Sequence, residues 1–298
     1  PGFVENTLSQ PLLTIAPHAD QAGDAAKNEN TASEVHDLGK RLRSISGNLC
    51  AWLDQSEEEH VYYVEKSGGA AQTLSLHSAP IDVAPRLREI FFSGGKSCVF
   101  TSATLGVGQD EELRYFRQRV GAQKAVAASI SSPFDFRKQM RLYLVKSMPQ
   151  PGSPAYDDAV AEKVSHFLKL SDGRAFVLFT SYSQMQLMAD RLEDLCAEHD
   201  WQLLVQGRGM ARHQLLQEFK NDTHSVLFGT DSFWTGVDVP GEALSNVIII
   251  RLPFAVPDHP VTAARLEHLE AQGRNPFTEY SVPEAILKLR QGVGRLIR

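Results

Sequence analysis

The chain has 298 residues, a formal net charge of −6 and 42% hydrophobic residues. This composition is typical of a globular protein of about two domains, and it excludes a strongly basic protein that binds nucleic acid through its overall charge. The three cysteines are scattered and form no Cys-x-x-Cys pair, which predicts a cytoplasmic protein in a reducing compartment with no metal site of its own. No apolar run approaches the roughly 18 residues of a membrane-spanning helix, so we expect no membrane partner.

The first part of the chain predicts few regular elements. Residues 1–33 are rich in Pro, Ala, Asn, Asp and Ser, which predicts irregular structure. From residue 34 to residue 53, apolar residues recur every three or four positions, which predicts an amphipathic helix. We then expect strands at 61–64 and 74–76, a helix at 86–92 and a short buried parallel strand at 98–100.

Strands and helices alternate regularly in the second half. The apolar runs predict strands at 176–179, 203–205, 226–228 and 247–250. A capping box of Ser183 and Gln186 predicts the start of the first intervening helix, and a second helix is expected at 210–220. This alternation predicts an α/β fold, in which a parallel sheet has helices on both faces and ligands bind beyond the carboxyl ends of the strands.

Polar and glycine-rich segments follow four of the expected strands, at 101–106, 180–182, 229–241 and 251–254. The third contains three glycines and several hydroxyl residues, which suit a loop whose backbone approaches a nucleotide or a sugar-phosphate. A C-terminal helix opened by Pro283 would place Gln291, Arg295 and Arg298 at i, i+4 and i+7, on one face. Such a face suits a polyphosphate, because guanidinium groups bind phosphate oxygens bidentately.

Taken in order, these segments resemble the motifs of superfamily 2 helicases. Motif III is resembled by Ser102-Ala103-Thr104, motif IV by Phe179-Thr180-Ser181-Tyr182, motif V by residues 229–241 and motif VI by residues 291–298. Further details narrow the resemblance to the DinG-type, XPD-like DNA helicases: Pro80-Ile81-Asp82-Val83, Ser132-Pro133-Phe134-Asp135, Ser232-Phe233-Trp234 and Arg251-Leu252-Pro253-Phe254. The resemblance covers residues 34–298.

The resemblance implies two RecA-like lobes of the P-loop NTPase type, which clamp ATP and Mg²⁺ between them and carry single-stranded DNA in the 5′ to 3′ direction, in repair or replication. It assigns the γ-phosphate contacts and the positioning of the attacking water to Arg295, Arg298 and Gln291. It assigns nucleotide binding to Gly236, Asp238 and Gly294, and DNA contact or coupling to Ser102, Thr104, Thr180, Ser181 and Thr230. Thr235 stands where many relatives have glutamate, which leaves the coupling role of that position open.

The resemblance also implies a division of the chain. Residues 1–58 would be the remnant of an arch domain with its return helix, residues 59–138 the C-terminal part of an incomplete first lobe, and residues 139–298 the second lobe. The sequence contains no Gly-x-x-x-x-Gly-Lys-Ser/Thr loop, because Ile90 stands where the first glycine before Gly95-Lys96-Ser97 would be. It contains no Mg²⁺-binding acidic box either. We therefore expect a C-terminal fragment that does not hydrolyse ATP by itself.

Two other functions remain open at this stage. A DinG-type protein with a fused exonuclease domain would carry an acidic nuclease motif upstream. A non-catalytic nucleic-acid-binding scaffold on a helicase fold would have no need to keep Gln291, Arg295 and Arg298 in register. The sequence does not tell whether an iron–sulfur cluster is present, because its cysteines would lie upstream, and it identifies no protein partner.

Overall fold

The computed structural model describes residues 4–68, 72–95, 97–108, 110–236, 239 and 241–297. They fall into two compact units. One contains Pro1–Pro85 and Pro257–Gly273, and the other contains Arg86–Val256 and Arg274–Arg298. The lobe boundary expected at residue 138 stays a prediction. Among the described residues, no helix is both long enough and apolar enough to cross a membrane.

The first unit begins with a pair of helices, α1 (Ser9–Asp24) and α2 (Glu29–Asp54). The helix expected at 34–53 is confirmed, but the prediction of irregular structure for residues 1–33 is wrong. Ala16 is fully buried, and a Cβ on Gly39 would lie 3.2 Å from the carbonyl oxygen of Ala16. The hydroxyls of Ser9 and Ser46 each donate to the other residue's carbonyl oxygen. Small residues thus bring the two helices together, and a search for large apolar residues does not detect them.

The rest of the first unit is a two-stranded antiparallel ribbon and one helix: β1 (His60–Ser67), β2 (Thr73–Pro80) and α10 (Pro260–Ala271). Both expected strands are confirmed. The Trp52 indole of α2 donates to the carbonyl oxygen of His77 over 2.9 Å, and Arg265 Nε of α10 donates to the carbonyl oxygen of Ile81 over 2.9 Å. Side-chain to backbone hydrogen bonds therefore hold both α2 and α10 to the ribbon.

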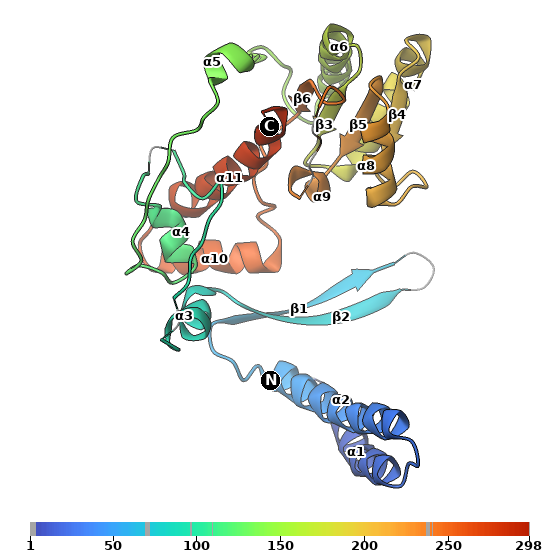
Figure 1. The fold of residues 1–298 in the computed structure, drawn as a ribbon, viewed down its shortest axis with the longest axis vertical. Helices are drawn as coiled ribbons and strands as arrows, with labels where there is room; N and C mark the ends of the chain where they lie inside the picture. The colour runs from blue at the N-terminus through green and yellow to red at the C-terminus, as the bar shows by residue number, and fades with distance from the viewer. Residues whose placement is uncertain are drawn as a thin grey trace. The chain divides into compact units, whose positions relative to one another are not determined.

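The second unit contains a four-stranded parallel sheet in the order β4-β5-β3-β6, seen from right to left in Figure 1. Its strands are β3 (Ala175–Leu178), β4 (Gln202–Val205), β5 (Ser225–Gly229) and β6 (Asn246–Ile249). In the register, Ala175 lies opposite Val226 on one side and Asn246 on the other. The predicted α/β fold with a parallel sheet is confirmed.

Helices cover both faces of this sheet. Alternate residues of β3 point to opposite sides: Ala175 and Val177 pack into the core under α6 (Pro154–Ser171) and α7 (Tyr182–Glu198). Phe176 and Leu178 pack into the core formed with α8 (Arg212–Asn221), α9 (Asp231–Trp234) and α11 (Val282–Val293). Because β3 and β5 are buried on both faces, their sequences are continuous apolar runs.

The second unit also contains shorter or more peripheral elements: α3 (Ala84–Phe92), which begins at the end of the first unit, α4 (Arg114–Arg119), α5 (Phe136–Gln139), the π-helix η1 (Phe277–Ser281) and the 3₁₀ helix η2 (Gly294–Leu296). The buried strand expected at 98–100 is not found. Val99 is 86% exposed, and no described strand pairs with this segment. An apolar run forms a buried strand only where neighbouring strands and helices cover it.

Candidate functional site

The carboxyl ends of the four parallel strands bring several predicted residues to one edge of the sheet. Thr180 and Ser181 follow β3, and Thr230 follows β5, its neighbour in the sheet. The Ser181 hydroxyl accepts a hydrogen bond from the backbone N–H of Gln184 and so caps α7. The cap predicted at Ser183 is therefore wrong by two residues, because the helix begins at Tyr182 and not at residue 184.

The β5 loop, which we define as residues 230–236, is held at its start by the loop after β4. The backbone N–H and the hydroxyl of Thr230 both donate to Gln206 Oε1, over 2.8 and 3.0 Å. Gln206 in turn accepts from Gln186 Nε2 of α7 through its carbonyl oxygen. Sequence analysis did not single out Gln206, although it follows a strand and precedes Gly207, which is the same pattern that identified the other loops.

Trp234 brings three of the predicted motifs into contact. Its indole Nε1 donates to the carbonyl oxygen of Phe179 over 3.1 Å, and its side chain is completely buried. A Cβ on Gly292 of α11 would lie 3.1 Å from the indole ring, so any larger residue would require the ring to shift by a few tenths of an ångström. Lys288 of α11 lies over the same ring, 5.9 Å from its centroid, and pairs with Asp231. The segments assigned to motifs IV, V and VI therefore pack around one side chain.

The residues predicted near the C-terminus do not share one exposed face. The α-helix ends at Val293 and continues as the 3₁₀ turn η2, which changes the angle between successive side chains. Gln291 is exposed, whereas Arg295 is only 3% exposed, and Gly294 between them is exposed. Arg298 and Asp238 lie outside the described residues.

The Ser-Ala-Thr loop, residues 101–106, has no regular structure. Ser102 is exposed, and its hydroxyl accepts from the backbone N–H of Thr104 over 3.2 Å. The carbonyl oxygen of Gly106 accepts from the guanidinium of Arg290 on α11. This hydrogen bond joins the Ser-Ala-Thr loop to α11, at residues that lie next to the segments assigned to motifs III and VI.

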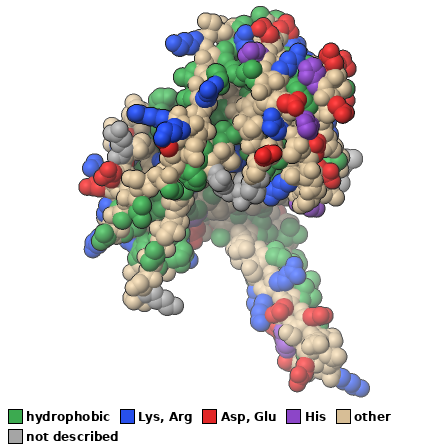
Figure 2. Space-filling view, turned by 45° about the horizontal axis from the view of Figure 1, so that its top comes forward, with side chains coloured by type: hydrophobic (Ala, Val, Ile, Leu, Met, Phe, Trp, Pro, Cys, Tyr) green, Lys and Arg blue, Asp and Glu red, His purple; other side chains and the backbone are tan. Residues whose placement is uncertain are grey.

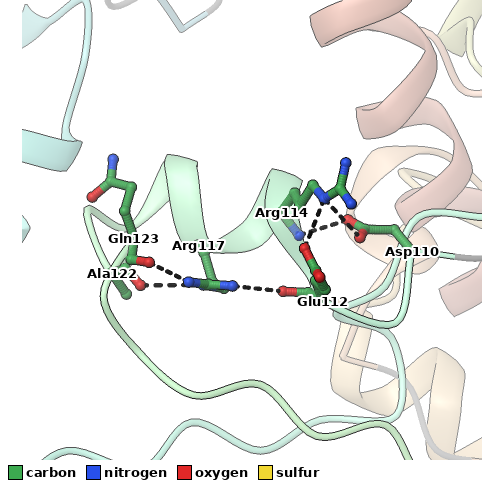
Figure 3. Close-up of polar contacts among 6 residues, drawn as sticks. All are labelled: Asp110, Glu112, Arg114, Arg117, Ala122 and Gln123. Carbon is green, nitrogen blue, oxygen red and sulfur yellow. Dashed lines mark hydrogen bonds and ion pairs between the residues drawn. The ribbon is translucent and has the colours of Figure 1, made fainter.

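The short helix α4 follows this loop, and two of its arginines contact the chain on either side of the helix, as Figure 3 shows. Arg117 donates to the carbonyl oxygens of Glu112, Ala122 and Gln123, on both sides of the helix. Arg114 pairs with Glu112 over 2.9 Å. These contacts hold the chain before and after α4 in place.

The other side of α4 contacts the C-terminal helix. The Tyr115 hydroxyl donates to the Glu284 carboxylate, and Arg119 lies 3.7 Å from the same carboxylate and over the Tyr280 ring. Burial of Tyr115, followed by its hydrogen bond to Glu284, raises the pKa of the phenol well above its ordinary range. Tyr115 therefore stays a neutral hydrogen-bond donor at physiological pH.

The electrostatic character of the surface is mixed. On the face that Figure 2 shows, Lys and Arg side chains are interspersed with Asp and Glu side chains and form no single basic field. Within the described ranges, no group of three or more His, Cys, Asp or Glu side chains could hold a metal ion. The described polar groups at the loops that follow β3 and β5 are mainly hydroxyls, backbone amides and the Arg212 guanidinium, which suit phosphate oxygens, and the Asp231 carboxylate is paired with Lys288.

Comparison with known proteins gives a family match over the parallel sheet and the helices around it. Residues 164–298 match the family described as the helicase C-terminal domain. The chain is 36% identical over 259 residues to the ATP-dependent DNA helicase YoaA of Haemophilus influenzae, covering 87% of this chain and 39% of that protein. It is 38% identical over 226 residues to the ATP-dependent DNA helicase YoaA of Escherichia coli, covering 76% of this chain and 34% of that protein.

A further relative is named for a different activity. The 3′-5′ exonuclease DinG of Bacillus subtilis is 34% identical over 283 residues, covering 93% of this chain and 30% of that protein. The chain thus spans well under half the length of these curated relatives.

Proposed function

Because the chain belongs to the DinG-type helicases, we propose that it supplies the second RecA-like lobe and adjoining segments of an ATP-dependent DNA helicase. The observation that supports this most is the packing of the predicted motifs IV, V and VI around Trp234. A helicase lobe needs such contacts, because a change at the nucleotide must reach the DNA-binding loops. The division at residues 58 and 138, and movement along single-stranded DNA from 5′ to 3′, belong to the same proposal.

In this proposal, Arg295 and Arg298 face the γ-phosphate. Gln291 positions either the γ-phosphate or the attacking water. Gly236, Asp238 and Gly294 serve the nucleotide side of the site. When bound, ATP supplies the phosphoryl group that is transferred to water. The Arg295 guanidinium is a buried donor and suits an anion. Mg²⁺ does not fit the described residues, which hold no carboxylate cluster for it, so no step through the metal is derived from this chain.

DNA contact in the second lobe would come from the loops that follow β3 and β5. Thr180 and Ser181 offer hydroxyls and backbone amides at the carboxyl edge of the sheet, which bind phosphates without reading sequence. Thr230, whose backbone N–H and hydroxyl both donate to Gln206, would take part by holding the start of the β5 loop. Ser102 and Thr104 would link hydrolysis to movement, and the hydrogen bond from Arg290 to Gly106 is the described contact through which they could do so.

The arginine assignment is tested in the full-length protein. Arg298→Ala should lower kcat for DNA-stimulated ATP hydrolysis by about 10³- to 10⁵-fold with little change in KM, because an arginine finger stabilises transition-state charge. Arg298→Lys should rescue little, since a point charge does not reproduce the planar fork. Arg191→Lys, at the Arg191–Asp158 surface pair, is the control. Near wild-type turnover by the Arg298→Lys protein would show that Arg298 is a surface residue.

The DNA assignment is tested with the 298-residue chain and a fluorescent oligonucleotide of one base type. Each neutralised phosphate contributes about 0.7 to the slope of log K against log salt for single strands, so two or three contacts predict a slope near −2. Oligonucleotides of different bases should bind alike. A slope steeper than about −5 would contradict the proposal, because it would require a dedicated basic patch in place of a few hydroxyl and amide contacts.

An exonuclease is the second candidate, because the Bacillus subtilis relative carries that name and aligns with 93% of the chain. The two functions separate in one experiment on the full-length protein. A helicase variant with Arg298→Ala should lose ATP hydrolysis and duplex unwinding together. If the variant instead releases nucleotides from a 3′ end at the wild-type rate, and the wild type unwinds no duplex, the exonuclease is the main activity. A scaffold would bind DNA and show neither activity.

A further inference from the structure

The side chain of Arg212, at the first position of α8, binds the backbone of the β5 loop at three points. Its Nε donates to the carbonyl oxygen of Ser232 over 3.1 Å. Its Nη2 donates to the carbonyl oxygens of Thr235 and Gly236 over 3.1 and 3.2 Å. The guanidinium carbon also lies over the Phe233 ring, 5.5 Å from its centroid. One planar fork therefore binds the end of α9 and the residues that follow it.

The helix that carries Arg212 is firmly placed. Leu215 is 2% exposed and Phe219 is fully buried, and the Phe219 ring lies 4.6 Å from the Phe176 ring of β3. Both side chains belong to the core under α8, α9 and α11. The backbone that carries Arg212 is thus fixed relative to the sheet.

The loop has the backbone shape that this contact requires. Gly236 has φ +65°, in the left-handed region that favours glycine, and a Cβ there would lie 3.7 Å from Arg212 Nη2. This turn directs the carbonyl oxygens of residues 235 and 236 toward the same nitrogen. The chain then leads to residue 238, the carboxylate assigned above to the nucleotide side.

We propose that Arg212 is a positioning residue, which holds the β5 loop in the geometry that couples DNA binding to ATP hydrolysis. The coupling role rests on the proposed function, whereas the three contacts do not. Lysine cannot replace the arginine, because one ammonium on a flexible stem cannot reach three carbonyl oxygens in a fixed fork. The alternative is that Arg212 contacts a DNA phosphate, in which case charge alone would matter and lysine would suffice.

The contact is tested first by hydrogen exchange on the full-length protein without ligands. Arg212→Lys and Arg212→Gln should both speed the exchange of the backbone amides of residues 231–236 by about tenfold or more, since hydrogen bonds from a charged donor are lost. Amides of β3 and β5 should keep their protection. Arg191→Gln, which removes a surface arginine between α6 and α7, should leave the loop unchanged. Wild-type exchange in the Arg212→Lys protein would overturn the positioning role.

The coupling role is tested by the ratio of ATP turnover with single-stranded DNA to turnover without it. Both Arg212 variants should lower this ratio by about tenfold, and the Arg191→Gln protein should keep it. A Lys variant with the wild-type ratio, together with a Gln variant that loses DNA affinity, would overturn the proposal in favour of a phosphate contact. A wild-type protein that DNA does not stimulate would overturn the proposed function and the coupling role, and the exchange data would still decide the contact.

Discussion

The β5 loop and the Ser-Ala-Thr loop differ in how the fold supports them. The β5 loop follows a strand that lies between β4 and β3, and contacts from four directions hold it: from Gln206, Phe179, Arg212 and Lys288. The Ser-Ala-Thr loop follows an exposed segment that pairs with no described strand. The difference shows that the β5 loop obtains its geometry from the packed elements around it together with its own Trp234 and Gly236, whereas the Ser-Ala-Thr loop has no paired strand before it.

The largest expected effect comes from removing one aromatic side chain in or next to each of the two loops. Trp234→Ala should lower the free energy of unfolding by about 3–5 kcal/mol, because it empties a fully buried site between β3 and α11. Phe100→Ala, just before the Ser-Ala-Thr loop, should cost about 1 kcal/mol, because Phe100 is 41% exposed. Urea unfolding of the two variants measures both values.

Equal losses from the two variants would contradict the comparison. They would mean that Phe100 is covered in solution as well as Trp234 is, and that the strand predicted at 98–100 forms after all. A Trp234→Phe variant is the matched control, because it keeps most of the buried volume and removes the hydrogen bond to Phe179.

Much of the second unit could be predicted from the sequence because its strands are buried on both faces. Such strands appear as short apolar runs, and the helices between them show three-to-four-residue periodicity, as with Met185 and Met188. The same rule failed at 98–100, where an apolar run lies exposed. It also missed α1, whose contact with α2 uses Ala16 and Gly39 instead of large side chains.

The candidate site was predicted only in part, for a related reason. Thr180, Ser181 and Thr230 follow strands, so their place at one edge of the sheet could be inferred from order alone. Gln206 and Arg212 form hydrogen bonds with the backbone of a loop some 20 residues away, and no local sequence pattern predicts such a contact. The exposures of Gln291 and Arg295 depend on where the last helix changes to a 3₁₀ turn, which single-residue propensities do not fix.

A second test compares one glycine from each region. A Cβ on Gly229, the last residue of β5 before the β5 loop, would lie 2.6 Å from Phe233 Cβ, so Gly229→Ala should cost about 1–3 kcal/mol as overpacking. A Cβ on Gly106 would lie 3.3 Å from the end of the Leu113 side chain, which can move. Gly106→Ala should therefore cost within about 0.5 kcal/mol. Thermal unfolding measures the stability of both variants. A lower Tm for Gly106→Ala than for Gly229→Ala would contradict the comparison.

The smallest expected effect concerns the turn that leads into β5. The Asp222 carboxylate accepts a hydrogen bond from the Ser225 hydroxyl over 2.6 Å and one from the backbone N–H of His224 over 2.9 Å. Burial alone would raise the pKa of Asp222, but these hydrogen bonds outweigh it and hold the pKa below its ordinary value.

Because the folded-state pKa of Asp222 is depressed, its contribution to stability is present above the pKa of the unfolded chain and is lost as pH falls through the folded value, below about pH 4. Asp222→Asn should be less stable than wild type at pH 7 and should lose less further stability between about pH 5 and pH 3. Ser225→Ala should shift the curve in the same direction, since it removes one donor. Urea unfolding midpoints measured across this pH range check the prediction. If the midpoint of the Asp222→Asn protein falls with decreasing pH as steeply as that of the wild type, the Asp222 carboxylate does not help to fix the strand that positions the β5 loop.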